Sequence, residues 1–310
     1  MAGGVRGRNI WVLSAGAHSS VSKACSIVGI GREFLKDMTS SLHASAFDLL
    51  QLEMTLRDDV SDNGGAIVVA TFGEVNSGAF TPNIAEISRL CKQYNAWLHI
   101  DAAFGILARI HPNKRTLAAG LELADSISFD GHKFFNVPYD CGVFLMRNMS
   151  VLASVCGNTG AVYLSPGIDV AAGQHSPLNV GLENSRRFRA LPLYASLLSL
   201  GKEGYVDIVV RCCRFAETLG KELDRSAKFR LLLPVEFNIV LFQAVGYESV
   251  ERNDRVRDAV NGTGKMYLSG TTWKGEGALR IAVCNYLTPS DAAVEASIIL
   301  SILTSVLPLP

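Results

Sequence analysis

A histidine and a lysine stand side by side where a buried strand is expected to end. The segment from Asp125 to Gly142 has the sequence DSISFDGHKFFNVPYDCG. Its residues 126–129 predict a strand, and Asp130-Gly131 predicts a turn that sets His132 and Lys133 just past the strand's carboxyl end. Open α/β sheets bind ligands at that end. A lysine that is partly desolvated there holds more free amine, which can form a Schiff base with a carbonyl; the alternative is an ordinary surface lysine after a turn.

A carboxylate and a second histidine share one face of another predicted strand. Residues 97–101 have the sequence WLHID, and the two-residue period of a strand places His99 and Asp101 on the same face near its carboxyl end. A carboxylate there can meet a metal ion, a substrate amine or a protonated ring nitrogen. A His-x-Asp pair supplies two types of metal ligand, but no dense His, Asp and Glu cluster accompanies it, so we predict no metal site. The small pair Ala102-Ala103 leaves room for a flat molecule.

A histidine and a run of arginines each have two interpretations, as ligand-binding residues or as residues with a structural role alone. His18 follows the predicted strand 9–13 and precedes a predicted helix, so it either faces a ligand or lies beside a helix cap. Three arginines, Arg186, Arg187 and Arg189, either bind an anion such as a phosphate or form a solvated charge run at the start of a helix. These residues alone do not decide between the interpretations.

Composition narrows the class of protein. The chain has 310 residues, with 29 basic residues against 29 acidic ones, so nothing favours nucleic acid or an anionic membrane as a partner. The seven cysteines are odd in number and contain no C-x-x-C pair, which indicates reduced thiols rather than a disulfide framework or a zinc site. No segment has the pattern of a signal peptide or a transmembrane helix, so we expect a soluble cytoplasmic protein.

Strands and helices alternate through the first part of the chain. Apolar runs predict strands at residues 9–13, 66–70, 97–101, 126–129 and 142–146. The run at 142–146 is of the type that is buried in a sheet. A helix is predicted at residues 45–57, with Phe47, Leu50 and Met54 on one apolar face that Leu49, Leu52 and Leu56 partly extend. Another helix is predicted from Thr81-Pro82, which supplies an N-cap and a first-turn proline. This order makes βα units of an α/β domain.

The composition changes after residue 190. Residues 151–185, just before the change, predict a long loop near the site. Helices are predicted at residues 191–200, 205–223, 249–260 and 294–307, and strands at 237–243, 266–269 and 278–283. We therefore predict two domains, with residues 1–190 forming a large α/β domain and residues 191–310 a small α+β domain.

The order of these segments resembles a known family. The segments are His18, Thr71, HIDAAFG around Asp101, DGHK ending at Lys133, SRRFRALPLYASL at 185–197 and GALRIAVCN at 277–285. Together they are similar to the pyridoxal-phosphate-dependent amino acid decarboxylases, the group that includes the aromatic amino acid, tyrosine, glutamate and histidine decarboxylases. The similarity covers nearly the whole chain. It implies the aspartate-aminotransferase-like fold type I, with a mostly parallel sheet in the large domain and a small α+β carboxyl-terminal domain.

The resemblance implies a cofactor and a reaction. The cofactor would be pyridoxal 5'-phosphate (PLP), with Lys133 forming the internal aldimine and Asp101 pairing with the pyridine nitrogen. An amino acid substrate would lose its α-carboxylate through a quinonoid intermediate and leave as an amine. A carboxylate beside the ring nitrogen favours its protonated form, and the ring then accepts the electrons that departing carbon dioxide leaves behind.

The resemblance also gives roles to residues around the cofactor. His18 would stack on the ring and take part in catalysis beside the lysine. Ala103 would pack on the opposite face of the ring, and Thr71 would make a polar contact beside it. Asp130 and His132 would lie near the phosphate or the substrate.

The chain departs from the family pattern at three places. Only seventeen residues precede His18, so the glycine-rich segment that grips the phosphate in relatives is missing, and the chain resembles an amino-terminally shortened form. Phe104 stands where many relatives carry tyrosine, and Glu74 stands where threonine is common. Tyr163 is a candidate for the tyrosine that a flexible loop supplies in aromatic-acid enzymes.

Three functions follow as hypotheses. The leading one is a PLP-dependent carboxy-lyase that acts on an amino acid as a cytoplasmic homodimer, with no nucleic acid or membrane partner. The second is a non-catalytic homologue that keeps the scaffold for oligomerisation or weak cofactor binding, which the missing phosphate segment suggests. The third is a cysteine-desulfurase-like lyase, which shares the Asp-x-Ala and His-Lys elements. Residues 134–142 and 185–197 favour the decarboxylases.

Overall fold

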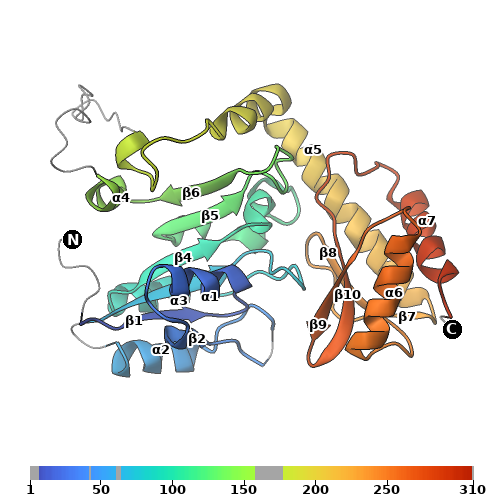
Figure 1. Cartoon of the computed structure of the whole chain (residues 1–310), viewed down its shortest axis with the longest axis horizontal. Coiled ribbons are helices and arrows are strands. Elements are labelled where there is room, and N and C mark those ends of the chain that lie inside the picture. The colour runs from blue at the N-terminus through green and yellow to red at the C-terminus, as the bar shows by residue number, and fades with distance from the viewer. Residues whose placement is uncertain (1–6, 42, 61–63, 158–176, 309–310) are drawn as a thin grey trace.

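Two sheets, joined by one long helix, organise the chain (Figure 1). The computed structural model describes residues 7–41, 43–60, 64–157 and 177–308. The first sheet has six strands, and the second has four. The helix α5 (Ala190–Arg225) runs from one sheet to the other, with a non-helical Gly201 inside it (φ 59°, ψ −171°). The two helices predicted on either side of Gly201–Gly204 therefore form one element with a kink at Gly201.

The first sheet is parallel except at one edge. Its strands are β1 (Ile10–Ser14), β2 (Leu35–Asp37), β3 (Gly65–Thr71), β4 (Trp97–Asp101), β5 (Ser126–Asp130) and β6 (Gly142–Met146), in the order β2-β1-β3-β4-β5-β6. Thr71 is in register with Asp101, and Asp101 with Ser128. Because β3, β4 and β5 are parallel, their carboxyl ends meet at one edge, and the residues predicted to do chemistry follow these ends.

Helices lie between the strands of this sheet and after its last strand. They are α1 (Ser19–Ile27), α2 (Leu49–Asp58), α3 (Ile84–Gln93) and α4 (Met149–Cys156), with short 3-10 turns at Arg32–Phe34, Gly105–Ile110, Arg115–Ala118, Leu121–Leu123 and Pro177–Asn179. The predicted start of α3 at Thr81-Pro82 is wrong, because the helix begins at Ile84 after the left-handed Asn83. Thr81 instead bonds the backbone of Thr71 in both directions, at 2.9 and 3.1 Å, which ties this loop to the end of β3.

The apolar face predicted for α2 is confirmed for Leu52 and Leu56 and wrong for Leu50 and Met54, and the predicted burial of β6 is wrong. Leu50 and Met54 of α2 are exposed, and the buried face of this helix is Leu52, Thr55 and Leu56. The predicted buried strand β6 is instead the edge of the sheet, and it pairs only with β5 among the described strands. Phe144 and Leu145 are the exposed apolar residues at its centre.

The second sheet is antiparallel and lies in the carboxyl-terminal part. Its strands are β7 (Phe229–Leu231), β8 (Ile239–Ala244), β9 (Ser269–Trp273) and β10 (Glu276–Ala282), in the order β7-β8-β10-β9. The helices α6 (Val250–Gly262) and α7 (Ala292–Ser305) complete this part, and α7 packs against α5. The strand predicted at 266–269 lies further along as β9, while β2 and β7, of three residues each, were not predicted.

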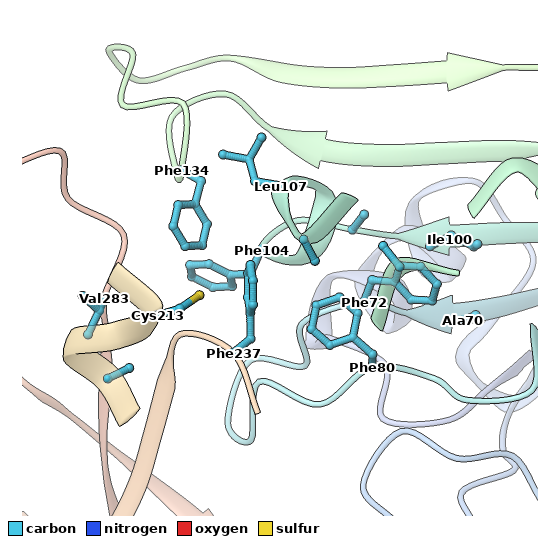
Figure 2. Close-up of a cluster of buried hydrophobic side chains, with 14 of the residues drawn as sticks. Ala70, Phe72, Phe80, Ile100, Phe104, Leu107, Phe134, Cys213, Phe237 and Val283 are labelled. Carbon is cyan, nitrogen blue, oxygen red and sulfur yellow. The ribbon is translucent and has the colours of Figure 1, made fainter. Parts of the chain in front are cut away.

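A chain of aromatic rings packs the two parts together (Figure 2). The ring of Phe237 lies 5.4 Å from Phe80 and 5.6 Å from Phe134, and Phe80 lies 5.4 Å from Phe72. All four side chains are buried. Phe134 directly follows Lys133, so the burial of its ring anchors the lysine turn in the core. Within the described ranges, no helix has the length and apolar character needed to cross a membrane.

Candidate functional site

Six of the seven predicted site residues line one pocket of about 320 Å³. They come from the carboxyl ends of three neighbouring strands and from the start of α1: His18, Thr71, Asp101, Ala103, Asp130 and Lys133. The volume lies within the range of small-molecule sites, about 300–1,000 Å³. The shared pocket brings the amine that follows β5 and the carboxylate at the end of β4 to one cavity.

Lys133 lies in the turn after β5, and its side chain is 25 % exposed. Its Nζ is 3.0 Å from Oδ2 of Asp130 and 4.4 Å from the centre of the Phe104 ring. The aromatic face and the carboxylate hold the amine from two sides. Phe104, which departs from the family pattern, therefore forms a contact surface for the lysine.

Asp101 ends β4 and turns its carboxylate toward the following loop. Its Oδ1 accepts a hydrogen bond from the Ala103 backbone at 3.1 Å, and its backbone oxygen accepts one from Phe72 at 2.8 Å. The loop approaches closely here, because a Cβ added at Gly105 would lie 2.5 Å from the Phe72 oxygen. The backbone thus holds the acid in place and leaves Oδ2 without a hydrogen bond from the described residues.

His18 and Thr71 also line this pocket. His18 is the N-cap of α1: its Nδ1 accepts from the Ser20 backbone at 3.3 Å and lies 2.8 Å from the Ser20 hydroxyl. The ring is exposed, which leaves its face open to a ligand. The Thr71 hydroxyl donates to the Gly16 oxygen at 3.4 Å and so links β3 to the loop that carries His18.

His132 does not line the pocket. The Cys141 backbone N–H donates to its Nδ1 at 3.1 Å, its Nε2 lies 3.8 Å from Oδ2 of Asp130, and its ring packs 4.0 Å from the Tyr139 ring. His132 therefore lies beside the carboxylate that pairs with Lys133, without lining the pocket itself. Its position supports an indirect effect on the lysine.

His99 lies on β4 but is committed to the sheet. Its Nδ1 is 2.8 Å from the Ser126 hydroxyl and its Nε2 is 3.1 Å from the Ser128 hydroxyl. Both ring nitrogens therefore lie at hydrogen-bond distance from serine hydroxyls. In the part of the chain that the structure describes, no three His, Cys, Asp or Glu residues lie close enough together to hold a metal ion. Burial lowers the pKa of His99, against a smaller opposing effect of the Asp101 charge.

Acidification is expected to destabilise the fold through His99. Because the pKa of His99 in the folded protein lies below the ordinary 6.5, the unfolded chain binds a proton that the folded protein does not as the pH falls through that value. The free energy of unfolding, measured in urea between about pH 8 and about pH 5.5, should fall more steeply with acidification in the wild type than in His99→Gln. Burial also lowers the pKa of His111, but His111 is present in both proteins and contributes equally to both. Equal dependence of the unfolding free energy on pH in the wild type and in His99→Gln would therefore contradict this prediction.

Asn136 was not predicted and ties the lysine turn to the carboxyl-terminal part. It has a left-handed backbone (φ 52°), and its Nδ2 donates to the oxygens of Phe134 at 2.8 Å and Cys284 at 3.0 Å. Its Oδ1 accepts from the Tyr286 backbone at 3.0 Å. One side chain therefore fixes the turn after Lys133 against the loop that follows β10. An asparagine soon after a predicted turn is the only sequence signal, since asparagine tolerates this conformation.

Replacing Asn136 with alanine should loosen this connection. The variant loses three hydrogen bonds and replaces asparagine, which tolerates the left-handed region, with alanine, which does so less well, so we expect a loss of about 2–4 kcal/mol in the free energy of unfolding. Asn136→Gly loses the same bonds without backbone strain and should recover about 1 kcal/mol of this loss. Chemical denaturation of the two variants measures both effects, and a variant as stable as the wild type would contradict the assignment.

Two hydrogen bonds connect the pocket loop 73–78 to the second sheet. Thr271 Oγ1 donates to Oδ1 of Asn76 at 2.8 Å, and Arg280 Nη1 donates to the oxygen of Val75 at 2.6 Å. Glu74, the other departure from the family pattern, is buried and accepts hydrogen bonds from the backbone and hydroxyl of Ser77, both at 2.7 Å. Glu74 thus shapes the loop from within.

The arginine run binds carboxylates of its own chain. Arg187 and Arg189 both contact Asp140, at 3.1 and 3.0 Å, and Arg186 contacts Glu183 at 3.0 Å. Arg189 is also the N-cap residue of α5, which matches the interpretation as a helix start. Of the predicted loop 151–185, residues up to Cys156 belong to α4, and Tyr163 lies outside the described residues.

A larger cavity of about 760 Å³ adjoins the pocket at Gly16. It lies between the loops of the first sheet and residues 233–236 and 273–274, and Lys274 is the lysine in its lining. His43 and Glu236 face each other there at 3.7 Å, and burial raises the pKa of Glu236. Lys274 is exposed, whereas Lys133 is partly buried and paired with Asp130, so the smaller pocket is the candidate active site.

The fold is that of an α/β protein with a mostly parallel sheet. Its pocket lies at the carboxyl ends of the parallel strands and places an amine and a carboxylate around space for a small ligand. The chain belongs to the pyridoxal-dependent decarboxylase family, because residues 2–245 match the conserved domain of that family. The family's cofactor is pyridoxal phosphate. The predicted fold is confirmed by its match to Oryza sativa TDC solved with PLP and tryptamine, with a TM-score of 0.85, 25% identity and coverage of 97% of this chain and 64% of that one.

Two relatives show the range of the family. The chain is 32% identical over 283 residues to the aromatic-L-amino-acid decarboxylase of Drosophila lebanonensis, covering 90% of this chain and 67% of that protein. It is 30% identical over 241 residues to the L-2,4-diaminobutyrate decarboxylase of Acinetobacter baumannii, covering 77% and 46%. The chain therefore spans from about half to two thirds of the length of these relatives.

Proposed function

We propose that this chain carries the catalytic centre of a PLP-dependent carboxy-lyase that removes the α-carboxylate of an amino acid. The observation that carries the proposal is the single pocket lined by Lys133, Asp101 and four other predicted residues. Membership of the decarboxylase family supports the reaction class. The non-catalytic and cysteine-desulfurase-like alternatives find no support in the relatives described above.

The residues present fit the cofactor. PLP combines an aldehyde, a basic ring nitrogen and a flat ring, and the pocket offers an amine, a carboxylate and the small side chain of Ala103. When bound, the cofactor supplies an electron sink for the bond that breaks at the α-carbon. Lys133 would bind it through the aldehyde carbon, and Asp101 would bind it at the ring nitrogen.

The other pocket residues would position the ring. His18 and Ala103 would lie against its two faces, and Thr71 would make a polar contact at its edge. Asp130, paired with Lys133 at 3.0 Å, would hold the amine at the aldehyde end, and His132 would hold Asp130 from behind. The protein's contribution is then orientation and fixed charge around the reacting atoms.

The substrate is proposed only as an amino acid. The names of the relatives cover aromatic amino acids and 2,4-diaminobutyrate, which differ in the size and charge of their side chains. The adjoining cavity, with Glu236 and His43, offers space into which a substrate side chain could extend. The homodimer and the cytoplasmic location stay predictions.

The proposal is tested by loading the purified chain with PLP, dialysing it and measuring carbon dioxide release from L-tryptophan, L-tyrosine, L-glutamate and L-2,4-diaminobutyrate. We expect at least one of these four amino acids to yield carbon dioxide and the matching amine in equal amounts. A chain that retains PLP through dialysis and releases no carbon dioxide from any of the four would contradict the lyase and favour a non-catalytic homologue.

A further inference from the structure

The larger cavity meets the candidate active site at two loops. Gly16 lines both spaces, while Ala17 lines the larger cavity and His18 lines the pocket. The loop 73–77 also contributes residues to both. Gly16 has a φ of 65°, and a β-carbon added there would lie 2.5 Å from the Ala44 oxygen, so only glycine fits this position. The two spaces therefore meet at a residue that has no side chain to separate them.

Glu236 lines the larger cavity with a half-buried carboxylate, 27% exposed. Among the described residues its ion-pair contact is to His43, at 3.7 Å, which is longer than a hydrogen bond of about 2.7–3.2 Å. Burial raises the pKa of Glu236, and the charge of His43 opposes this effect. A half-buried carboxylate without a close cation is costly, so a cation that approached Glu236 more closely than His43 does would be bound favourably.

The other charged groups of this wall respond less to a bound charge. The carboxylate of Glu74 accepts hydrogen bonds from the backbone and hydroxyl of Ser77, both at 2.7 Å, and from the backbone of Asn76 at 3.0 Å. Lys274 is exposed in the turn between β9 and β10, where water and salt screen its charge. Glu236 is therefore the group of this wall that selects most strongly by charge.

The remaining wall suits a hydrocarbon chain. Leu233, Pro234 and Trp273 line the cavity, and tryptophan is the aromatic residue that binds cations best. An apolar wall with one half-buried carboxylate complements a side chain that consists of methylenes and ends in an amine. A neutral aromatic side chain would leave Glu236 without a close cation, and an acidic side chain would place a like charge beside it.

We propose that the larger cavity binds the side chain of the substrate, that this side chain ends in an amine, and that Glu236 selects it. The inference rests on the proposed function, since it assigns the reacting end of the amino acid to the pocket of Lys133 and the far end to the cavity beyond Gly16. The substrate class is then the basic amino acids with an aliphatic side chain.

The test compares amino acids that differ only in the terminal amine. The kcat/KM for carbon dioxide release by the PLP-loaded chain is measured for L-2,4-diaminobutyrate, L-ornithine and L-lysine. Each is paired with the amino acid that lacks the amine, namely L-2-aminobutyrate, L-norvaline and L-norleucine. For at least one pair we expect the amine-bearing member to be preferred by about tenfold or more, because a hydrogen bond to a charged group contributes about 1.5–3 kcal/mol.

Matched variants locate the selecting group. Glu236→Gln keeps the size of the side chain and removes its charge, so the preference for the amine-bearing member should fall to about one. Glu222→Gln makes the same change on α5, where Glu222 pairs with Arg225 at 2.7 Å outside the cavity lining, and it should keep the preference of the wild type.

The outcomes separate this inference from the proposed reaction. Carbon dioxide release without a preference in any pair, or with the same preference in Glu236→Gln, overturns the selection and leaves the reaction standing. If no amino acid yields carbon dioxide, the reaction fails and the same pairs are tested by calorimetric binding to the PLP-loaded chain. Tighter binding of an amine-bearing member that is lost in Glu236→Gln then supports the selection, and equal binding within every pair overturns it.

Discussion

Replacing Lys133 with alanine is expected to abolish the visible absorbance band of bound PLP and to lower the rate of carbon dioxide release by on the order of a thousandfold or more. The expectation follows from the position of the amine, which lies in the pocket 3.0 Å from Asp130 and against the Phe104 ring. Among the described residues, Lys133 is the only lysine that lines this pocket. The absorbance spectrum after addition of PLP and dialysis measures the effect.

Lys133→Arg is the matched control for this experiment. Arginine keeps the positive charge and can keep the pairing with Asp130, but its guanidinium does not form an imine. Both variants should lose the band while they keep the unfolding free energy of the wild type to within about 1 kcal/mol. A band that survives unchanged in either variant would place the covalent bond to the cofactor on another residue.

Replacing Asp101 with asparagine is expected to separate cofactor binding from catalysis. Asparagine has nearly the same shape and can still accept the hydrogen bond from the Ala103 backbone, so the pocket should keep its form. The negative charge that would favour a protonated ring nitrogen is lost. We therefore expect PLP to bind through Lys133, while carbon dioxide release falls by about 10²- to 10³-fold.

The measurement for Asp101→Asn is single-turnover carbon dioxide release from the PLP-loaded variant, with the amount of bound cofactor determined first. Asp101→Glu restores the charge but moves it by about one methylene length, and it should recover part of the rate. A full rate in Asp101→Asn would remove the carboxylate from the reaction and contradict its proposed position at the ring nitrogen.

The pocket could be predicted because it depends on local sequence. The apolar run before Thr71 and the WLHID and SISF segments are strands by pattern alone, and parallel strands bring their carboxyl ends to one edge. That rule places Thr71, Asp101 and Lys133 near one another without knowledge of any contact. The structure describes them around one cavity.

Contacts between distant segments could not be predicted in this way. Asn136 reaches Cys284 and Tyr286 nearly 150 positions away, and no spacing in the sequence indicates such a pair. The pairing of Arg187 with Asp140 is of the same kind. Periodicity indicates which residues are apolar on a face, but the partner of that face is set by tertiary packing.

The errors in the predicted strands and helices have the same origin. The apolar run of β6 predicts an inner strand, and the structure places it at an edge because no described strand lies beyond it. In α2, Leu50 and Met54 have helical spacing, but Leu52 and Leu56 are the buried leucines. The choice between two apolar stripes of one helix depends on its neighbours and not on its own sequence.

The central claim is that Lys133 is the residue that binds the cofactor. Borohydride reduction of the PLP-loaded chain, followed by proteolysis and mass spectrometry of the peptides, tests it most directly, because reduction makes the bond between an amine and the aldehyde permanent. We expect one pyridoxyl group, on the peptide that contains Lys133. Modification of Lys274 in the larger cavity instead, or no modified lysine, would contradict it.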